Sequence, residues 1–258
     1  PAVAEKESRD AITSSITSTM EVVKRKLDFI KADTGISKED QATLENLYRK
    51  VISNLESALS HEQTAAEFIK AEHKAEADAD ALRKEMVRKG KISPETELKS
   101  YAAKELEILE PLLLKEEANL SAVVAKLTKA KEKLKYHTER PQIIRKRLIE
   151  ANREVNGIAS DLQKPTATGV LPAISEASHW SNETSATMLS TEIKMLDQEL
   201  LSHPMRIGLL EAELAEAEQS EMYVRFRVDY LEKIVNEKRQ SKASEVQVEA
   251  EIAEQEAE

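Results

Sequence analysis

Residues 106–134 read LEILEPLLLKEEANLSAVVAKLTKAKEKL, and this stretch decides the fold class. Its stripe steps alternately by three and four residues: Leu106, Leu109, Leu113, Glu116, Leu120, Val123, Leu127, Ala130 and Leu134. An average repeat of 3.5 residues is typical of a helix that packs through a narrow stripe against one or two neighbours. The stretch therefore predicts a long helix in a coiled-coil-like pair.

The same spacing recurs along most of the chain. Further stripes run from Ile16 to Ile30, Leu44 to Ala58, Ile144 to Leu162, Ala186 to Leu200 and Leu210 to Val235. Ser37, followed three residues later by Asp40, is a candidate N-terminal cap, and Gly90 is a candidate helix end.

Proline marks the expected interruptions. Pro94, Pro141, Pro172 and Pro204 are predicted to lie at helix starts, Pro111 to kink a helix or start one, and residues 164–169 to form a loop. The expected fold is all-α, with about six long amphipathic helices in elongated antiparallel coiled-coil-like hairpins, kinked at proline.

The composition of the 258 residues excludes several classes of protein. Aromatic residues make up 3%, and there are five glycines and no cysteine, which disfavours sheet-rich folds and thiol or disulfide chemistry. The net charge of −10 argues against general nucleic-acid binding. No stretch has the roughly 18–20 consecutive apolar residues of a membrane span. We find no HExxH, GxGxxG, P-loop, GxSxG or EF-hand pattern, so we predict no enzyme activity and no catalytic, cofactor-binding or metal-binding residues.

One basic run offers a candidate contact surface. Between residues 129 and 147 it carries eight cations against two glutamates: Lys129, Lys131, Lys133, Lys135, Arg140, Arg145, Lys146 and Arg147. The run could touch anionic lipid, cell-wall polymer or an acidic partner. It could equally pair with the surplus glutamates of its own chain.

Three ordered motifs resemble a known family. They are Glu139-Arg140-Pro141-Gln142-Ile143-Ile144, the stretch from Leu200 to Ala212 (LLSHPMRIGLLEA), and Asn236-Glu237-Lys238-Arg239. In this order and spacing they are similar to the periplasmic N-terminal "porin" domain of large MscK-type mechanosensitive channels, within the MscS superfamily. The resemblance defines residues 140–244 as C-terminal helical hairpins. Residues 1–139 are expected to form N-terminal hairpins, and 245–258 an acidic tail or truncated helix.

The resemblance implies a sensory or scaffolding domain that modulates a tension-gated ion channel. It places the domain in the periplasm of a Gram-negative bacterium, attached to an inner-membrane protein. A signal peptide would precede Pro1, and transmembrane helices and a pore would follow Glu258. The implied partner is the rest of the same channel chain, with a homo-oligomer in the full-length protein. The alternative from the residues alone is a free-standing coiled-coil adaptor or scaffold, unrelated to channels.

Overall fold

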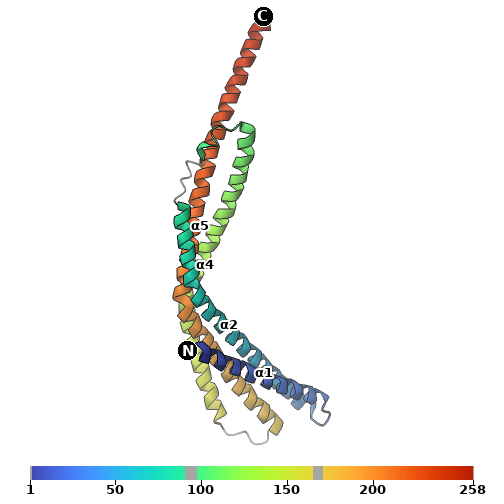
Figure 1. The fold of residues 1–258 in the computed structure, drawn as a ribbon. Helices are drawn as coiled ribbons and strands as arrows, with labels where there is room; N and C mark the ends of the chain where they lie inside the picture. The colour runs from blue at the N-terminus through green and yellow to red at the C-terminus, as the bar shows by residue number, and fades with distance from the viewer. Residues whose placement is uncertain (1, 91–97, 165–170, 258) are drawn as a thin grey trace. The chain divides into compact units, whose positions relative to one another are not determined.

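The computed structural model describes residues 2–90, 98–164 and 171–257, and these ranges contain helices and no strand (Figure 1). Their long helices are α1 (Ala2–Ala32), α2 (Lys38–Gly90), α4 (Leu106–Leu162) and α5 (Pro172–Ala257). The predicted all-α class is therefore confirmed. The predicted number of about six helices is wrong, because the described ranges contain four long ones.

Two expected helix starts, Pro141 and Pro204, lie inside α4 and α5. A proline inside a helix removes one backbone donor and costs about 3 kcal/mol. In α5, buried Ser202 and Leu210 lie on either side of Pro204. In α4, Pro141 lies between half-buried Leu134 and buried Ile144. Packing on both sides favours continuation of each helix, so these two predictions are wrong.

The other proline predictions have mixed outcomes. Helix α5 begins at Pro172, as predicted. Helix α4 begins before Pro111, where the carbonyl of Glu105 accepts bonds from the amides of Ile108 and Leu109, each at 3.1 Å. The predicted start at Pro94 and most of the predicted loop at 164–169 lie outside the described residues.

The chain divides into two compact units, each made of two segments. Unit 1 comprises Pro1–Lys74 and Glu139–Met205, and unit 2 comprises Ala75–Thr138 and Arg206–Glu258. Helices α2, α4 and α5 each contribute to both units. The sequence-based division at residues 139 and 244 stays a prediction.

In unit 1, α1 and α2 form a hairpin whose turn is held by local hydrogen bonds. The Ser37 hydroxyl accepts from the Asp40 amide at 3.1 Å and donates to the Asp40 carboxylate at 2.7 Å, as expected of a cap. The side-chain amide of Gln41 donates to the backbone carbonyl of Ile30 at 2.9 Å. This bond gives a partner to a carbonyl that has none within the last turn of α1. The predicted cap at Ser37 is confirmed.

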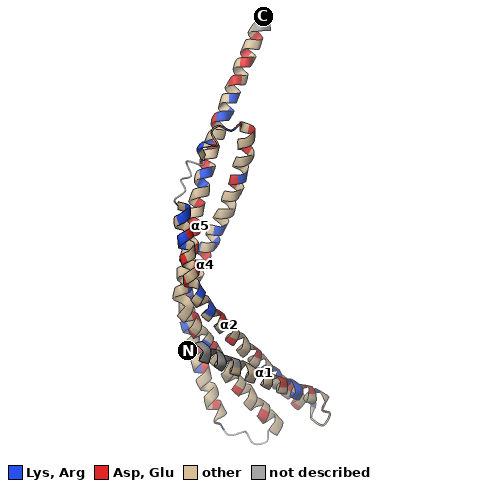
Figure 2. Cartoon of the chain, in the orientation of Figure 1, with Lys and Arg blue, Asp and Glu red and all other residues tan. Residues whose placement is uncertain are grey.

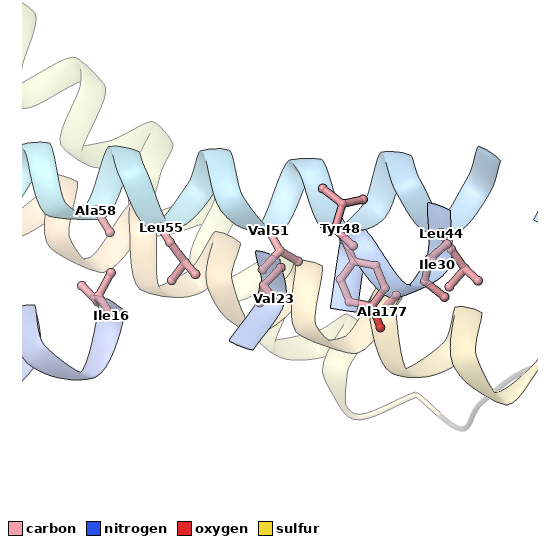
Figure 3. Packing of buried hydrophobic residues seen from close by; sticks show 10 residues of the cluster. Ile16, Val23, Ile30, Leu44, Tyr48, Val51, Leu55, Ala58 and Ala177 are labelled. Atoms are coloured by element: carbon pink, nitrogen blue, oxygen red, sulfur yellow. The ribbon is translucent and has the colours of Figure 1, made fainter. Parts of the chain in front are cut away.

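The apolar core of unit 1 joins α1, α2 and α5 (Figure 3). Its buried members are Ile16, Val23, Leu27, Ile30, Leu44, Tyr48, Val51, Leu55, Ala58 and Ala177. Nearly all belong to the stripes read from the sequence, and burial of each large member stabilises the fold by about 1.5–3 kcal/mol.

The apolar core of unit 2 is smaller. Leu109 of α4 and Leu231, Ile234 and Val235 of α5 form its buried cluster. The long stripe of α4 does face the interior, but of its nine members only Leu109 and Glu116 are buried, and the rest are half-buried. The end of α2 also packs in this unit, where the Gln219 side chain of α5 donates to the Met86 carbonyl at 3.2 Å.

Candidate functional site: ion pairs between α4 and α5

Both acidic and basic residues occur along α4 and α5 (Figure 2). Cross-helix ion pairs join these two helices, and their order shows that the helices run antiparallel. At the start of α4 in unit 2, the carboxylates come from α4 and the cations from α5. Lys242 Nζ lies 2.8 Å from Glu107 Oε1, and Arg239 Nη2 lies 2.7 Å from Glu110 Oε1. These two pairs are exposed, so each contributes little to stability.

A third pair of the same polarity is buried. Arg227 Nη2 lies 3.0 Å from Glu116 Oε1, with the two side chains 17% and 8% exposed. The Tyr101 hydroxyl lies 3.4 Å from the same guanidinium nitrogen. Glu116 occupies a stripe position that would otherwise be apolar. Its charge is tolerated there because Arg227 reaches it from α5.

Further along the same interface of unit 2, the polarity reverses. Lys126 Nζ donates to Glu216 Oε2 at 2.6 Å, and Lys133 Nζ donates to Glu213 Oε2 at 3.0 Å. Lys131 lies 3.9 Å from Glu218. Here α4 supplies the cations and α5 the carboxylates.

In unit 1 the cations also come from α4, and both are arginines with two-point contacts. Arg140 donates to the two oxygens of Glu199 at 2.8 and 2.9 Å. Arg147 donates to both oxygens of Glu192 at 2.7 Å and to Glu154 at 2.8 Å. Such paired, charge-assisted bonds are stronger and more directional than single lysine contacts.

The spacing explains why one helix can present all these cations. Lys126, Lys133, Arg140 and Arg147 follow one another at seven-residue intervals, which keeps them beside the apolar stripe. Because the polarity reverses after Glu116, a large shift of α4 along α5 in unit 2 would bring like charges together. The pairs therefore specify the antiparallel alignment more than they add to overall stability.

Ion pairing also lowers the pKa of the carboxylates and raises the pKa of the cation in the examples that follow. The hydrogen bond from Lys126, reinforced by its charge, lowers the pKa of Glu216. The hydrogen bonds to Glu192 and Glu154 raise the pKa of Arg147 further above its usual value. The hydrogen bond from Lys242 likewise lowers the pKa of Glu107. These groups are therefore charged at neutral pH.

The structure splits the basic run into two groups. Lys131, Lys133, Arg140 and Arg147 pair with glutamates of α5. In the described part of the chain no carboxylate pairs with the exposed residues Lys129, Lys135, Arg145 and Lys146. Pairing with the chain's own glutamates thus accounts for half of the run. Sequence reasoning did not identify the partners on α5, because they become neighbours only through the antiparallel alignment.

The described chain has two hollows of a size that could hold a small molecule. One of about 820 Å³ in unit 2 is lined chiefly by Val123, Met222, Tyr223, Val224 and Phe226. The other, of about 370 Å³ in unit 1, lies beside the paired Arg147 and Glu192. The first has an apolar lining, and in the second these two charged groups already bind each other. Ser220 also lines the first hollow and donates to Glu216, but that carboxylate is already paired with Lys126 and its pKa is lowered, so it is a weak base.

The described ranges contain no group of three or more His, Asp or Glu side chains placed to hold a metal ion. Within the same ranges, no helix combines the length and the apolar character needed to cross a membrane.

The fold and the ion-paired interface define an all-helical domain built from long paired helices. The chain belongs to the family of mechanosensitive ion channel porin domains, which it matches over residues 26–258. The match extends well before the motifs that begin at Glu139, and covers all of α2 but only residues 26–32 of α1. No curated protein and no solved structure matches the chain.

Proposed function

We propose that this chain is a non-catalytic sensory or scaffolding domain that modulates the gating of a tension-gated channel of the MscK type. The family match over residues 26–258 is the observation that carries the proposal. We place the domain in the periplasm, attached to the inner membrane of a Gram-negative bacterium. Its partner is the transmembrane and pore region of its own chain, and the full-length channel is an oligomer.

The ion pairs suggest how such a domain could act on a pore. A displacement is transmitted along paired helices only if the helices do not slide past each other. The polarity reversal on α4 and α5 opposes sliding in unit 2, and the two-point arginine contacts oppose it in unit 1. A stimulus that favours one packing over another would then change the closed-to-open equilibrium of the pore.

The direct test removes residues 1–258 from the full-length channel and records single channels in membrane patches. We expect a changed tension threshold or changed opening and closing rates, with the pore conductance unaltered. Unchanged gating at equal expression would contradict the modulatory role.

A finer test keeps the domain and alters only the ion pairs. Arg140→Glu with Arg147→Glu places like charges against Glu199 and Glu192, and should shift the gating threshold. Adding Glu199→Arg and Glu192→Arg restores opposite charges and should restore most of the original threshold. Arg153→Glu is the matched control, because this exposed residue of α4 has no carboxylate partner in the described chain.

We also propose that Lys129, Lys135, Arg145 and Lys146 form the surface that contacts anionic lipid or cell-wall polymer. These four exposed cations are the members of the basic run that α5 does not neutralise.

A further inference from the structure

A polar layer, meaning polar side chains that meet inside an otherwise apolar interface, lies between α2 and α5 in unit 1. Asn54 is 8% exposed and sits beside Leu55 in the buried stripe of α2. Its side-chain amide nitrogen lies 2.9 Å from Ser185 Oγ, 3.2 Å from Thr184 Oγ1 and 3.3 Å from the Ser181 carbonyl. Every one of these acceptors belongs to α5.

A second polar contact follows one heptad later. His61 Nδ1 lies 3.3 Å from the Met188 carbonyl and 3.4 Å from Thr191 Oγ1. Both Asn54–Thr184 and His61–Thr191 join residues 130 apart, so α2 and α5 run parallel here in one constant register. Around Asn54 and His61, the face of α5 that meets α2 carries the buried hydroxyl residues Ser181, Thr184, Ser185 and Thr191. Trp180 precedes them on the same face, and its ring lies edge-on to Tyr48 of α2.

Small side chains interlock weakly, so size alone distinguishes poorly between registers of this interface. Hydrogen bonding distinguishes them better, because a buried amide that loses an acceptor is disfavoured. If α2 packed one heptad nearer the start of α5, Asn54 would meet Ala177 and Ser178 instead of Thr184 and Ser185, and would keep one hydroxyl acceptor of the two. His61 would then meet Thr184 and keep a hydroxyl partner.

We propose that Asn54 selects the register of α2 on α5, and that without its amide α2 also packs one heptad nearer the start of α5. A single buried asparagine is the best attested polar device for fixing register in paired helices. Asn54 is thus a positioning residue, and the α2–α5 interface of unit 1 has a second packing within reach. This inference goes beyond the proposed function and does not depend on it.

The register can be tested by cross-linking, because the chain has no cysteine and introduced cysteines are its only thiols. Two double-cysteine chains are compared, each treated with the same short bismaleimide and analysed by mass spectrometry. Glu62→Cys with Lys194→Cys reports the observed register, because these side chains lie 3.9 Å apart. Glu62→Cys with Thr187→Cys reports the register shifted by one heptad.

With Asn54 present, we expect the 62–194 link to exceed the 62–187 link by about tenfold or more, corresponding to one lost buried hydrogen bond. In Asn54→Leu the two yields should approach each other. Asn54→Thr retains a hydroxyl donor and should recover most of the preference. Leu55→Ile, a conservative change at the adjacent buried residue, should leave the ratio as in the parent chain.

An unchanged ratio in Asn54→Leu would overturn the inference. If circular dichroism shows that the leucine variant is unfolded, Asn54→Ala decides in its place, since it also lacks the amide and alanine is well tolerated in helices. Links are measured on the 258-residue chain alone. Failure here therefore leaves the gating proposal untouched, and failure of the gating tests leaves the register result untouched.

Discussion

Units 1 and 2 use the same long helices but are stabilised in different ways. Unit 1 has an apolar cluster of ten buried residues from α1, α2 and α5, whereas the cluster of unit 2 has four from α4 and α5. In the described chain, α4 and α5 are joined by two sets of cross-helix ion pairs in unit 1 and six in unit 2. The larger apolar cluster supplies more burial in unit 1, whereas the ion pairs join α4 to α5 in both units.

The largest expected difference between the units comes from truncating a stripe leucine in each. Leu44→Ala removes a fully buried side chain of unit 1 and should cost about 3 kcal/mol. Leu120→Ala removes a half-buried one of unit 2 and should cost about 1 kcal/mol. Urea unfolding followed by Trp180 fluorescence reports unit 1, and hydrogen exchange across residues 112–127 reports unit 2. Equal costs would contradict the comparison.

The next effect concerns the buried pair of unit 2. Glu116→Gln leaves Arg227 with a neutral partner and should destabilise unit 2 by about 2 kcal/mol, measured by hydrogen exchange. Replacing both residues by leucine should recover most of the loss, because no unpaired charge then remains buried. Glu117→Gln, at the exposed neighbouring position, is the control and should have little effect.

Added salt should produce a smaller difference in stability between the two units. Raising NaCl from about 0.05 M to about 1 M screens exposed ion pairs and should lower the stability of unit 2 by about 1 kcal/mol. Trp180 fluorescence should show no comparable loss in unit 1, because apolar burial is not screened. A larger salt effect in unit 1 would mean that ion pairs, not burial, dominate there.

The smallest expected effect is the change with acid in the stability that Glu216 contributes to unit 2. The folded-state pKa of Glu216 is lowered, so its pairing stabilises the protein above the unfolded value of 4.5 and is lost as pH falls through the folded value. The melting temperatures of the parent chain and of Glu216→Gln should therefore converge between about pH 6 and about pH 3. A constant gap over this range would show that Glu216 does not act through its charge.

The helical stripes could be predicted from the sequence because each depends on local spacing. The stripes of α1 and α2 correspond closely to the buried residues, including Ile16, Val23, Leu44 and Val51. The number of helices could not be predicted in the same way. Pro141 and Pro204 locally favour a break, and only the packing on both sides of each residue shows that the helix continues.

Only the basic half of the candidate site could be predicted from the sequence. The basic run was visible as a cluster of charge, but its partners Glu192, Glu199, Glu213 and Glu218 lie far away in sequence. Asn54 was overlooked because Leu55 beside it satisfies the apolar repeat equally well. A polar residue next to a stripe position gives no sign of its burial until the helix that covers it is known.

The central claim is that opposite charges specify how α4 pairs with α5, and a charge swap in unit 1 tests it most directly. Urea unfolding followed by Trp180 fluorescence is compared for the parent chain, for Arg140→Glu with Arg147→Glu, and for that variant with Glu199→Arg and Glu192→Arg added. We predict that the reversal costs about 2 kcal/mol and that the full swap restores most of it. A swapped chain as unstable as the reversed one would contradict the claim.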